Sequence, residues 1–588
     1  MQAHLTNQAT SAIEAVIAKG HPVIVAWSGG KDSSVVLNLV LSAARAQKER
    51  AKIVPIIITH ADTGIENPEI ARYAQKELLK IKAYGKACGL ELVVQVSRPQ
   101  LNSRWAVRVI GGRGLPVFPS SGGTGGGNRD CTLDYKVLPM QRLRKQILSG
   151  LARSEMPAVT VIGTRFEESA GRAQRMQNRG ETDTAPWVGA NDELYLSPIA
   201  RWDTEDVWAY ISNCMDGLTE AYSDFKQTFK LYAEASGSSC AIEADIAFGT
   251  QKSRSSGCGA RFGCMLCTAT NDKSMENMLA IDEYAYMREA HELQQFIIKT
   301  QYDLDRRLWV GRSINEYGYI AIRPDVYSPA MLLELLRYAL TIDVVEKQRA
   351  SAAQIEPRFE LIGAKELIAI DAMWSLQGYH RPFAALREYR DIYLGGRRYP
   401  VPNIKHFARV PICEARYYHV GPDWDEQVKR FSGFRDPVIE AFGGAGCMGK
   451  KELKDGRVVL DTQAEGPFSV DEEGAIFALT LDLDYLLDRV ACDCHSHTYG
   501  YPHHVSSGYL IPAKGKESVI DKIMRRTAFK ERHGLAGQSY NLAALLAKSV
   551  SRVEMEQGIR RAQLKAVPPR PMVQLTLPGF DIYQEKAA

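Results

Sequence analysis

The stretch from Val23 to Val40 reads VIVAWSGGKDSSVVLNLV and decides the fold of the first part of the chain. A β-type run, Val23 to Trp27, leads into a turn with two glycines and then into an amphipathic run. A strand, a glycine turn and a helix in that order are typical of the phosphate-binding edge of an α/β domain.

Further strand-like runs follow at intervals, each separated from the next by helical or loop sequence. They are IVPIIITH (53–60), ELVVQV (91–96) and AVTVIGT (158–164). Strands that alternate with helices predict a parallel sheet covered on both faces. We therefore expect an α/β fold for this part of the chain.

The glycine turn, Ser28, Gly29, Gly30, Lys31, Asp32 and Ser33, has the composition of an anion-binding loop. Glycines bring backbone N–H groups close to an anion, the helix N-terminus adds partial positive charge, and Lys31 adds a full charge. The string does not fit the kinase-type G-x-x-x-x-G-K-[ST] loop. We call Ser28 to Ser33 the phosphate loop and predict that it binds a phosphate group.

Charged residues follow two later strands. Asp62 lies in HADTGIENPEI after the second strand, where carboxylates would hold Mg²⁺ beside a phosphate or would cap the next helix. Arg165 and Arg172 lie in IGTRFEESAGR, where either would neutralise charge on a phosphate or form a surface salt bridge.

A group of cysteines predicts a metal centre. Cys258, Cys264 and Cys267 have the spacing C-x₅-C-x₂-C, and Cys240 precedes them. Four thiolates suit zinc or an iron–sulfur cluster, and the spacing does not choose between them. Cys131 lies apart, in a basic segment that would favour the reactive thiolate. It is a catalytic sulfur carrier, a packing residue or a further ligand of the metal centre.

Length and composition set the outer limits. The chain has 588 residues, 45% of them hydrophobic and 24% charged, as in ordinary globular proteins of several domains. It contains no apolar run long enough to span a membrane and no secretory signal pattern. With cysteines too sparse for a disulfide scaffold, we expect a cytoplasmic protein.

Four segments follow from these patterns. They are a nucleotide-binding α/β domain (1–235), a cysteine-rich segment (236–290), a helical segment (291–378), and a separate mixed domain (379–588) with loops and short strands. In the last, segment 381–409 has seven Lys/Arg against two acids with interleaved aromatics, and it is either a nucleic-acid surface or a solvated basic face. A later C-x-C-H-x-H…H-H run is a second metal site or a loop with incidental histidines, and its residues are Cys492, Cys494, His495, His497, His503 and His504.

Together these motifs resemble a known family. The order SGGKDSSVVL, DTGIENP, RDCTLDYKVLP, IGTRFEES, SPIARWDTEDVW and GCGARFGCMLCTATNDKSM is similar to the PAPS-reductase-like DndC proteins of bacterial DNA phosphorothioation, over roughly the first 65% of the chain. SGGKDS itself resembles the PP-loop of ATP pyrophosphatases. A related single-strand system uses a similar protein, called SspD.

The resemblance implies a reaction and a set of partners. ATP would adenylate a DNA backbone phosphate with release of pyrophosphate, through Lys31, Asp32 and Arg165. Sulfur from a cysteine desulfurase would pass through Cys131, and other phosphorothioation proteins, including an ATPase, would assemble with the chain. The four cysteines, Cys240, Cys258, Cys264 and Cys267, would then hold a [4Fe–4S] cluster rather than zinc.

The alternative is a true sulfonucleotide reductase acting on phosphoadenosine phosphosulfate (PAPS) or adenosine phosphosulfate (APS). Such enzymes share the fold and SGGKDS-like loops. They carry a catalytic cysteine in a C-terminal E-C-G-x-H element, and the iron–sulfur forms have an adjacent Cys-Cys pair. Neither element occurs in this chain.

Overall fold

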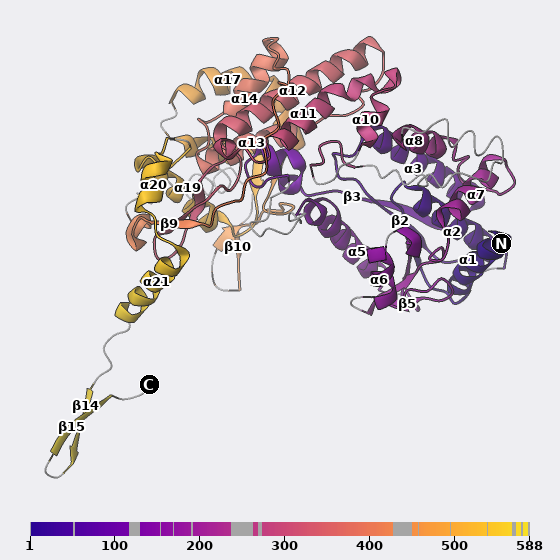
Figure 1. The fold of residues 1–588 in the computed structure, drawn as a ribbon, viewed down its shortest axis with the longest axis horizontal. Helices are drawn as coiled ribbons and strands as arrows, with labels where there is room; N and C mark the ends of the chain where they lie inside the picture. Colours follow the sequence, from indigo (N-terminus) through magenta and orange to yellow (C-terminus); the bar gives the residue numbers. More distant parts are fainter. Residues whose placement is uncertain are drawn as a thin grey trace.

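The structure of the chain is a computed structural model, and it describes most of the sequence. The described residues are 2–50, 53–116, 130–152, 154–168, 170–189, 192–236, 263–268, 273–426, 450–454, 456, 458–493, 496–537, 539–566, 572–577 and 580–585. Figure 1 places an α/β part at the N-terminal end beside a larger, mainly helical part, with the C-terminal hairpin at the far end.

The α/β part is built on a six-stranded sheet with the order β3-β2-β1-β4-β6-β5. Its strands are β1 (Val23–Ala26), β2 (Ile56–Ala61), β3 (Leu92–Ser97), β4 (Val159–Val161), β5 (Trp187–Val188) and β6 (Leu194–Leu196). Every pairing is parallel except that of β5 with β6. The predicted α/β fold with a mostly parallel sheet is confirmed.

Helices pack around this sheet because burying their apolar faces is favourable. They include α1 (Gln2–Ala18), α2 (Lys31–Glu49), α3 (Pro68–Cys88), α5 (Leu138–Gly150), α6 (Ala170–Asn178), α7 (Thr204–Met215) and α8 (Lys226–Ser236). Helix α1 packs on α2, and α2 packs on α7. The buried side chains of β1, α1 and α2 form one apolar core. The phosphate loop therefore connects a strand and a helix that close packing holds in place.

The next part contains the helices predicted for it and a sheet that was not. Helices α10 (Ser274–Met278), α11 (Arg288–Lys299), α12 (Pro329–Ala352) and α13 (Ala364–Gln377) form a layer. Between α11 and α12, the strands β7 (Val310–Ile314) and β8 (Tyr319–Ile322) form a hairpin, and β9 (Arg416–His419) extends it. The purely helical description of 291–378 was therefore incomplete.

The C-terminal third is more helical than its loop-rich sequence suggested. It contains α14 (Ala384–Tyr389), α16 (Glu472–Thr480), α17 (Leu483–Asp488), α18 (Gly500–Ser506), α19 (Glu517–Arg532), α20 (Leu542–Lys548) and α21 (Arg552–Ala566). Three antiparallel strand pairs accompany them, and their strands are β10 (Lys450–Glu452) with β11 (Val458–Leu460), β12 (Phe468–Val470) with β13 (Leu510–Pro512), and β14 (Met572–Leu577) with β15 (Phe580–Glu585).

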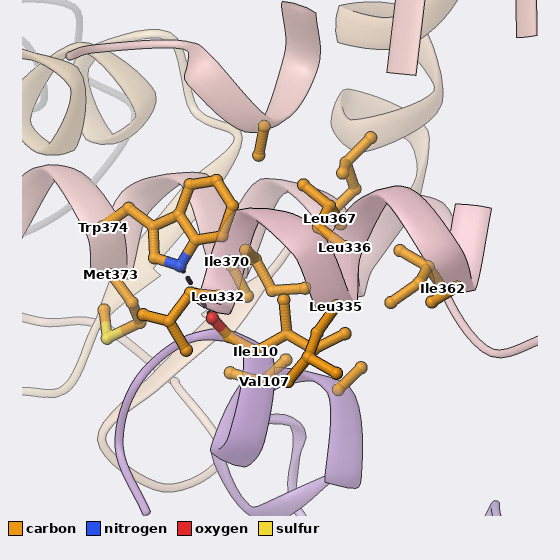
Figure 2. Close-up of a cluster of buried hydrophobic side chains, with 14 of the residues drawn as sticks. Val107, Ile110, Leu332, Leu335, Leu336, Ile362, Leu367, Ile370, Met373 and Trp374 are labelled. Atoms are coloured by element: carbon orange, nitrogen blue, oxygen red, sulfur yellow. Dashed lines mark hydrogen bonds between the residues drawn. The ribbon is translucent and has the colours of Figure 1, made fainter. Parts of the chain in front are cut away.

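A large apolar core joins these helices to the segment that follows the sheet. Figure 2 shows Val107 and Ile110 packed against Leu332 and Leu336 of α12 and Trp374 of α13. The indole Nε1 of Trp374 donates to the carbonyl of Ile110 at 2.7 Å. Gly378 ends α13 in the left-handed conformation, with a φ of 68°. The same core continues to residues beyond Gly378, so this glycine does not mark the edge of the core.

Within the described ranges, no helix is both long and apolar enough to cross a membrane.

Candidate active site

The phosphate loop connects β1 to α2 through two glycines with different tasks. Gly29 has a φ of 79°, a left-handed conformation that favours glycine. Gly30 is the extended N-cap of α2, which begins at Lys31. The Ser33 hydroxyl donates to the Gly30 carbonyl at 3.0 Å and accepts from the Ser28 amide at 3.2 Å. The loop is thus folded onto the first turn of a helix, where backbone amides favour an anion.

A tyrosine from α8 closes one side of the loop. The Lys31 amide donates to the hydroxyl of Tyr232 at 3.2 Å. The Lys31 ammonium lies 5.7 Å from the centre of the Tyr232 ring. Helix α8 thereby fixes the first residue of α2, although about 200 residues of chain separate them in sequence.

Asp32 links two predicted site cations. Its Oδ2 lies 3.0 Å from Nζ of Lys31, and its Oδ1 lies 2.6 Å from Nε of Arg165. Arg165 is buried, and its Nη1 also contacts Glu167 at 3.1 Å and the Thr204 hydroxyl at 3.3 Å. The structure therefore brings Lys31, Asp32 and Arg165 together at the loop. Charge-assisted hydrogen bonds of this kind hold side chains in fixed positions.

Gly163, at the end of β4, lets the backbone of the next strand approach the loop. A Cβ at this position would lie 3.0 Å from the carbonyl carbon of Asp32 and 3.1 Å from the amide nitrogen of Ser33. Only a glycine fits there without displacing the first turn of α2. The phosphate loop is thus packed directly against the carboxyl end of β4.

Residues that follow β2 form a turn and a helix cap. Asp62 accepts from the Gly64 amide at 2.9 Å and lies 2.9 Å from Nε of Arg98. Asn67 caps α3 by accepting from the Glu69 amide at 3.0 Å. The capping interpretation therefore holds for Asn67, and Asp62 lies at the sheet edge where Mg²⁺ was predicted.

Cys264 lies against this same turn. Glu66 pairs with Cys264 in an isolated antiparallel bridge, and the Met265 amide donates to the Ile65 carbonyl at 2.7 Å. Burial raises the pKa of the Glu66 carboxyl to about 7 and that of the Cys264 thiol to about 11. The positive charge of Lys136 acts in the opposite direction on both groups.

Cys131 and Cys264 act on a common neighbour. Burial is the main cause of the raised pKa of the Tyr135 hydroxyl. Both thiols, if ionised, would raise this pKa further. Both cysteines also pack on the large core. Cys131 lies in the short helix Asp130–Thr132, which continues through the π-helix Leu133–Val137 into α5. The predicted sulfur carrier thus lies in the neighbourhood of Cys264, Lys136 and Glu66.

Two of the four predicted cluster ligands are described. Cys264 and Cys267 lie on one turn, in which the Cys267 amide donates to the Cys264 carbonyl at 2.9 Å. Cys240 and Cys258 lie outside the described residues. In the part of the chain that the structure describes, no three His, Cys, Asp or Glu side chains converge as metal ligands do. The Cys264–Cys267 turn has the compact C-x-x-C form that thiolate sites use.

A cleft of about 620 Å³ lies between the π-helix that ends at Ile110 and α5. Its charged lining residues are Arg108, Arg113, Arg142, Lys145 and Asp134. Four cations and one carboxylate give the lining a formal charge of +3. Gln100, Asn102, Ser103 and Gln141 add polar groups. We call this the cationic cleft; Asp134 of its wall lies three residues after Cys131.

Comparison with known sequences identifies the α/β part. Residues 22–220 match the family described as the phosphoadenosine phosphosulfate reductase domain. These residues form a PAPS reductase-like domain. Among solved structures, the crystal structure of PAPS reductase from Candida auris in its phosphate complex is similar, with 13% sequence identity, a TM-score of 0.21, and coverage of 38% of this chain and 87% of that chain. No match was found among curated proteins.

The PAPS reductase-like domain contains the phosphate loop, Asp62, Cys131 and both predicted arginines. Arg172 lies on α6 and forms an ion pair with Glu168 one turn away. Arg165, in contrast, reaches the loop through Asp32. The ion pair with Asp32 therefore connects Arg165 to the phosphate loop. The phosphate-binding role of Arg172 remains a prediction.

Sequence reasoning missed two residues that contact or crowd the phosphate loop. Tyr232 lies in an ordinary amphipathic helix, and nothing in QTFKLYAEAS marks its hydroxyl for the loop. Gly163 did have a signal, because a glycine directly after a β-type run indicates close backbone approach. It stands in AVTVIGTRF, immediately before the predicted Arg165.

Two predictions outside the domain have mixed outcomes. In segment 381–409, Arg390 contacts Asp484 and Asp488, and Arg397 contacts Asp391, so part of its positive charge is compensated. In the run from Cys492, His504 is fully buried, with its Nε2 2.8 Å from Asp371. His504 therefore packs as a core histidine, whereas Cys494 and His495 lie outside the described residues.

Proposed function

We propose that the chain is an ATP-dependent sulfurtransferase that adenylates a backbone phosphate of DNA and then inserts sulfur. The observation that supports this most strongly is the arrangement at the phosphate loop. Lys31, Asp32 and Arg165 form one charged chain at the N-terminus of α2, inside a domain that matches the PAPS reductase family.

The loop suits the leaving group of an adenylation. An oxygen of the substrate phosphate would attack the α-phosphorus of ATP, and the bond to the β,γ-pyrophosphate would break. The amides of α2 and the Lys31 ammonium would hold the departing pyrophosphate. Arg165, whose Nε lies 2.6 Å from Asp32, would offset charge on the α-phosphate.

Cys131 would supply sulfur in the second step. A cysteine desulfurase would leave a persulfide on this thiol, and its terminal sulfur would attack the activated phosphorus and expel AMP. A second thiol would then attack the Cys131 sulfur and break its bond to the transferred sulfur. The phosphorothioate would leave, and a disulfide would join Cys131 to the second thiol.

Cys264 and Cys267, together with Cys240 and Cys258, would hold the [4Fe–4S] cluster that the family resemblance implies. Such a cluster, when bound, supplies one-electron redox chemistry. Mg²⁺ would bind with the phosphates of ATP. Asp62, which follows β2 at the edge of the sheet, would supply a carboxylate ligand to it.

The cationic cleft supports a substrate rich in phosphate. Its lining has a formal charge of +3 and includes Asp134, three residues after Cys131. Positive clefts attract a nucleic-acid backbone, and amide side chains can contact bases. The DNA strand would therefore enter between Arg108 and Arg142, with an ATPase and other phosphorothioation proteins presenting it.

Pyrophosphate release tests the first step. The full chain, ATP, Mg²⁺ and substrate DNA should release pyrophosphate, and Lys31→Ala or Asp32→Ala should lower the rate at least tenfold. Cys131→Ser should retain pyrophosphate release and lose sulfur incorporation. Unchanged release in both loop variants would refute an adenylating role for the loop.

The sulfonucleotide reductase is the second candidate, because the matched family is named for that activity. It predicts sulfite formation from PAPS or APS with an external thiol, without DNA or ATP. Sulfite production that depends on Cys131 and not on ATP would favour this candidate over DNA phosphorothioation.

A further inference from the structure

A second group of cations lies outside the PAPS reductase-like domain, where β7 meets α19. Lys530 of α19 is buried, and its ammonium donates to the carbonyl of Gly311 at 2.5 Å. Burial and the positive charges of Arg526 and Arg312 lower the pKa of Lys530 to about 7. The pKa of Arg526 is itself lowered to about 10, mainly by burial and also by Arg312.

A fourth cation extends the group toward the cationic cleft. Arg312 donates to the backbone carbonyl of Arg113 at 3.0 Å. Burial lowers the pKa of Arg113, and the charges of Arg108 and Arg312 lower it further. Arg113 lines the cationic cleft. Four positively charged side chains, Arg113, Arg312, Arg526 and Lys530, therefore lie near one another at this junction.

One carboxylate faces this group. Asp325 lies 3.2 Å from Nε of Arg312, and its charge raises the pKa of Lys530. Glu531, next to Lys530 in sequence, instead lies 2.7 Å from Nδ1 of His497. With four cations and one carboxylate, the group has a formal charge of +3 when Lys530 is protonated. Net positive charge in a partly buried site is unfavourable, so an anion bound in the cavity would stabilise the fold.

A cavity opens at the same place. It has a volume of about 350 Å³, and its lining includes Arg312, Ser313, Arg323, Asp325 and Gln377. Guanidinium groups bind phosphate oxygens through paired N–H donors, and a serine hydroxyl can donate a further hydrogen bond. The size suits a phosphate with its attached sugar or a neighbouring group.

We propose that this junction cavity binds a phosphate group, with Arg312 and Arg323 as direct ligands and with the buried Lys530 and the half-buried Arg526 behind them. The site is separate from the phosphate loop and does not depend on the activity proposed above. The phosphate is either that of a small phosphorylated molecule or a phosphodiester of a nucleic-acid strand, because both present the same oxygens.

The test measures binding of inorganic phosphate to the full chain by calorimetry, in the Lys31→Ala background so that the phosphate loop does not contribute. Arg323→Ala, at an exposed lining position, should weaken phosphate binding several-fold. Lys530→Met should weaken it at least tenfold. Lys522→Met changes an exposed lysine of the same helix and should leave affinity unchanged.

A single-stranded oligonucleotide identifies the source. Competition between the oligonucleotide and inorganic phosphate, lost in Arg323→Ala, would support a nucleic-acid phosphodiester. Phosphate binding without such competition would support a small phosphorylated ligand. No phosphate binding beyond that of chloride at equal ionic strength, or full affinity in Arg323→Ala, would overturn the proposal even if Lys530→Met does not fold.

Discussion

Nε of the buried Arg165 lies 2.6 Å from Oδ1 of Asp32, whose other oxygen lies 3.0 Å from Nζ of Lys31. One carboxylate therefore positions two cations that come from different strands of the sheet. The arginine follows β4, and the lysine follows β1. Neutralising Asp32 would release both cations from their positions at the phosphate loop.

The first prediction follows from this pair. Asp32→Asn should lower pyrophosphate release at least tenfold and the free energy of unfolding by about 1–3 kcal/mol, because buried Arg165 loses a charged partner. The control is Glu167→Gln, which removes the other carboxylate on Arg165; its side chain is 54% exposed, so the loss of stability should stay below about 1 kcal/mol. Equal effects of the two variants on pyrophosphate release would contradict the role given to Asp32.

The second prediction concerns Tyr232. Tyr232→Phe removes the acceptor of the Lys31 amide and should destabilise the nucleotide-free protein by about 1 kcal/mol. A phosphate oxygen can replace the lost hydroxyl as acceptor, so pyrophosphate should raise the melting temperature more in the variant than in the wild type.

Thermal melting with and without pyrophosphate measures this difference. Tyr73→Phe is the control, because the Tyr73 hydroxyl lies 2.5 Å from the Thr228 hydroxyl, whereas the Lys31 amide donates to Tyr232. A smaller pyrophosphate-induced shift in Tyr232→Phe than in wild type would mean that the Tyr232 hydroxyl binds the anion itself.

The third prediction tests the close approach at Gly163. Gly163→Ala should force β4 and the first turn of α2 apart, because its Cβ would lie 3.0 Å from the carbonyl carbon of Asp32. We expect a loss of about 1–3 kcal/mol in stability and a larger fractional loss of pyrophosphate release. Gly150→Ala, at the end of α5 with no atom within 4 Å of the new Cβ, should be neutral or slightly stabilising. Wild-type pyrophosphate release in Gly163→Ala would contradict this account.

The sequence predicted the phosphate loop because every signal there is local. The run of β-type residues, the glycines and the helix start in Val23 to Val40 are contiguous, and each has a direct backbone consequence. The partners of the loop are not local. Tyr232 reaches Lys31 only after α8 packs against the sheet, and one tyrosine in an amphipathic helix has no feature that predicts this.

The β7–β8 hairpin shows a different kind of failure. VGRSINEYGYIAI has short β-type runs around a turn that ends in Gly318, whose φ is 76°. The long helical patterns on either side hid this signal, and β9 joins the hairpin from nearly a hundred residues further along the chain. The sequence of α19 has an amphipathic pattern typical of a helix. The position of its Lys530 near Arg312, however, depends on tertiary packing alone.

The last prediction is the pH dependence that Lys530 gives to stability. Its pKa is lowered from 10.5 to about 7 in the folded chain, by burial and by Arg526 and Arg312, whereas Asp325 acts in the opposite direction. Between these pH values the unfolded chain binds a proton that the folded chain does not. The stability contribution of this group therefore rises with pH, by at most about 1.4 kcal/mol per pH unit, and is lost as the pH falls to 7. In phosphate-free buffer, wild type should gain stability relative to Lys530→Met between pH 7 and pH 9, as measured by urea unfolding, and Lys522→Met should follow wild type. Added phosphate favours the protonated amine and should flatten the wild-type dependence; a parallel pH course in wild type and Lys530→Met would contradict the buried, neutral lysine.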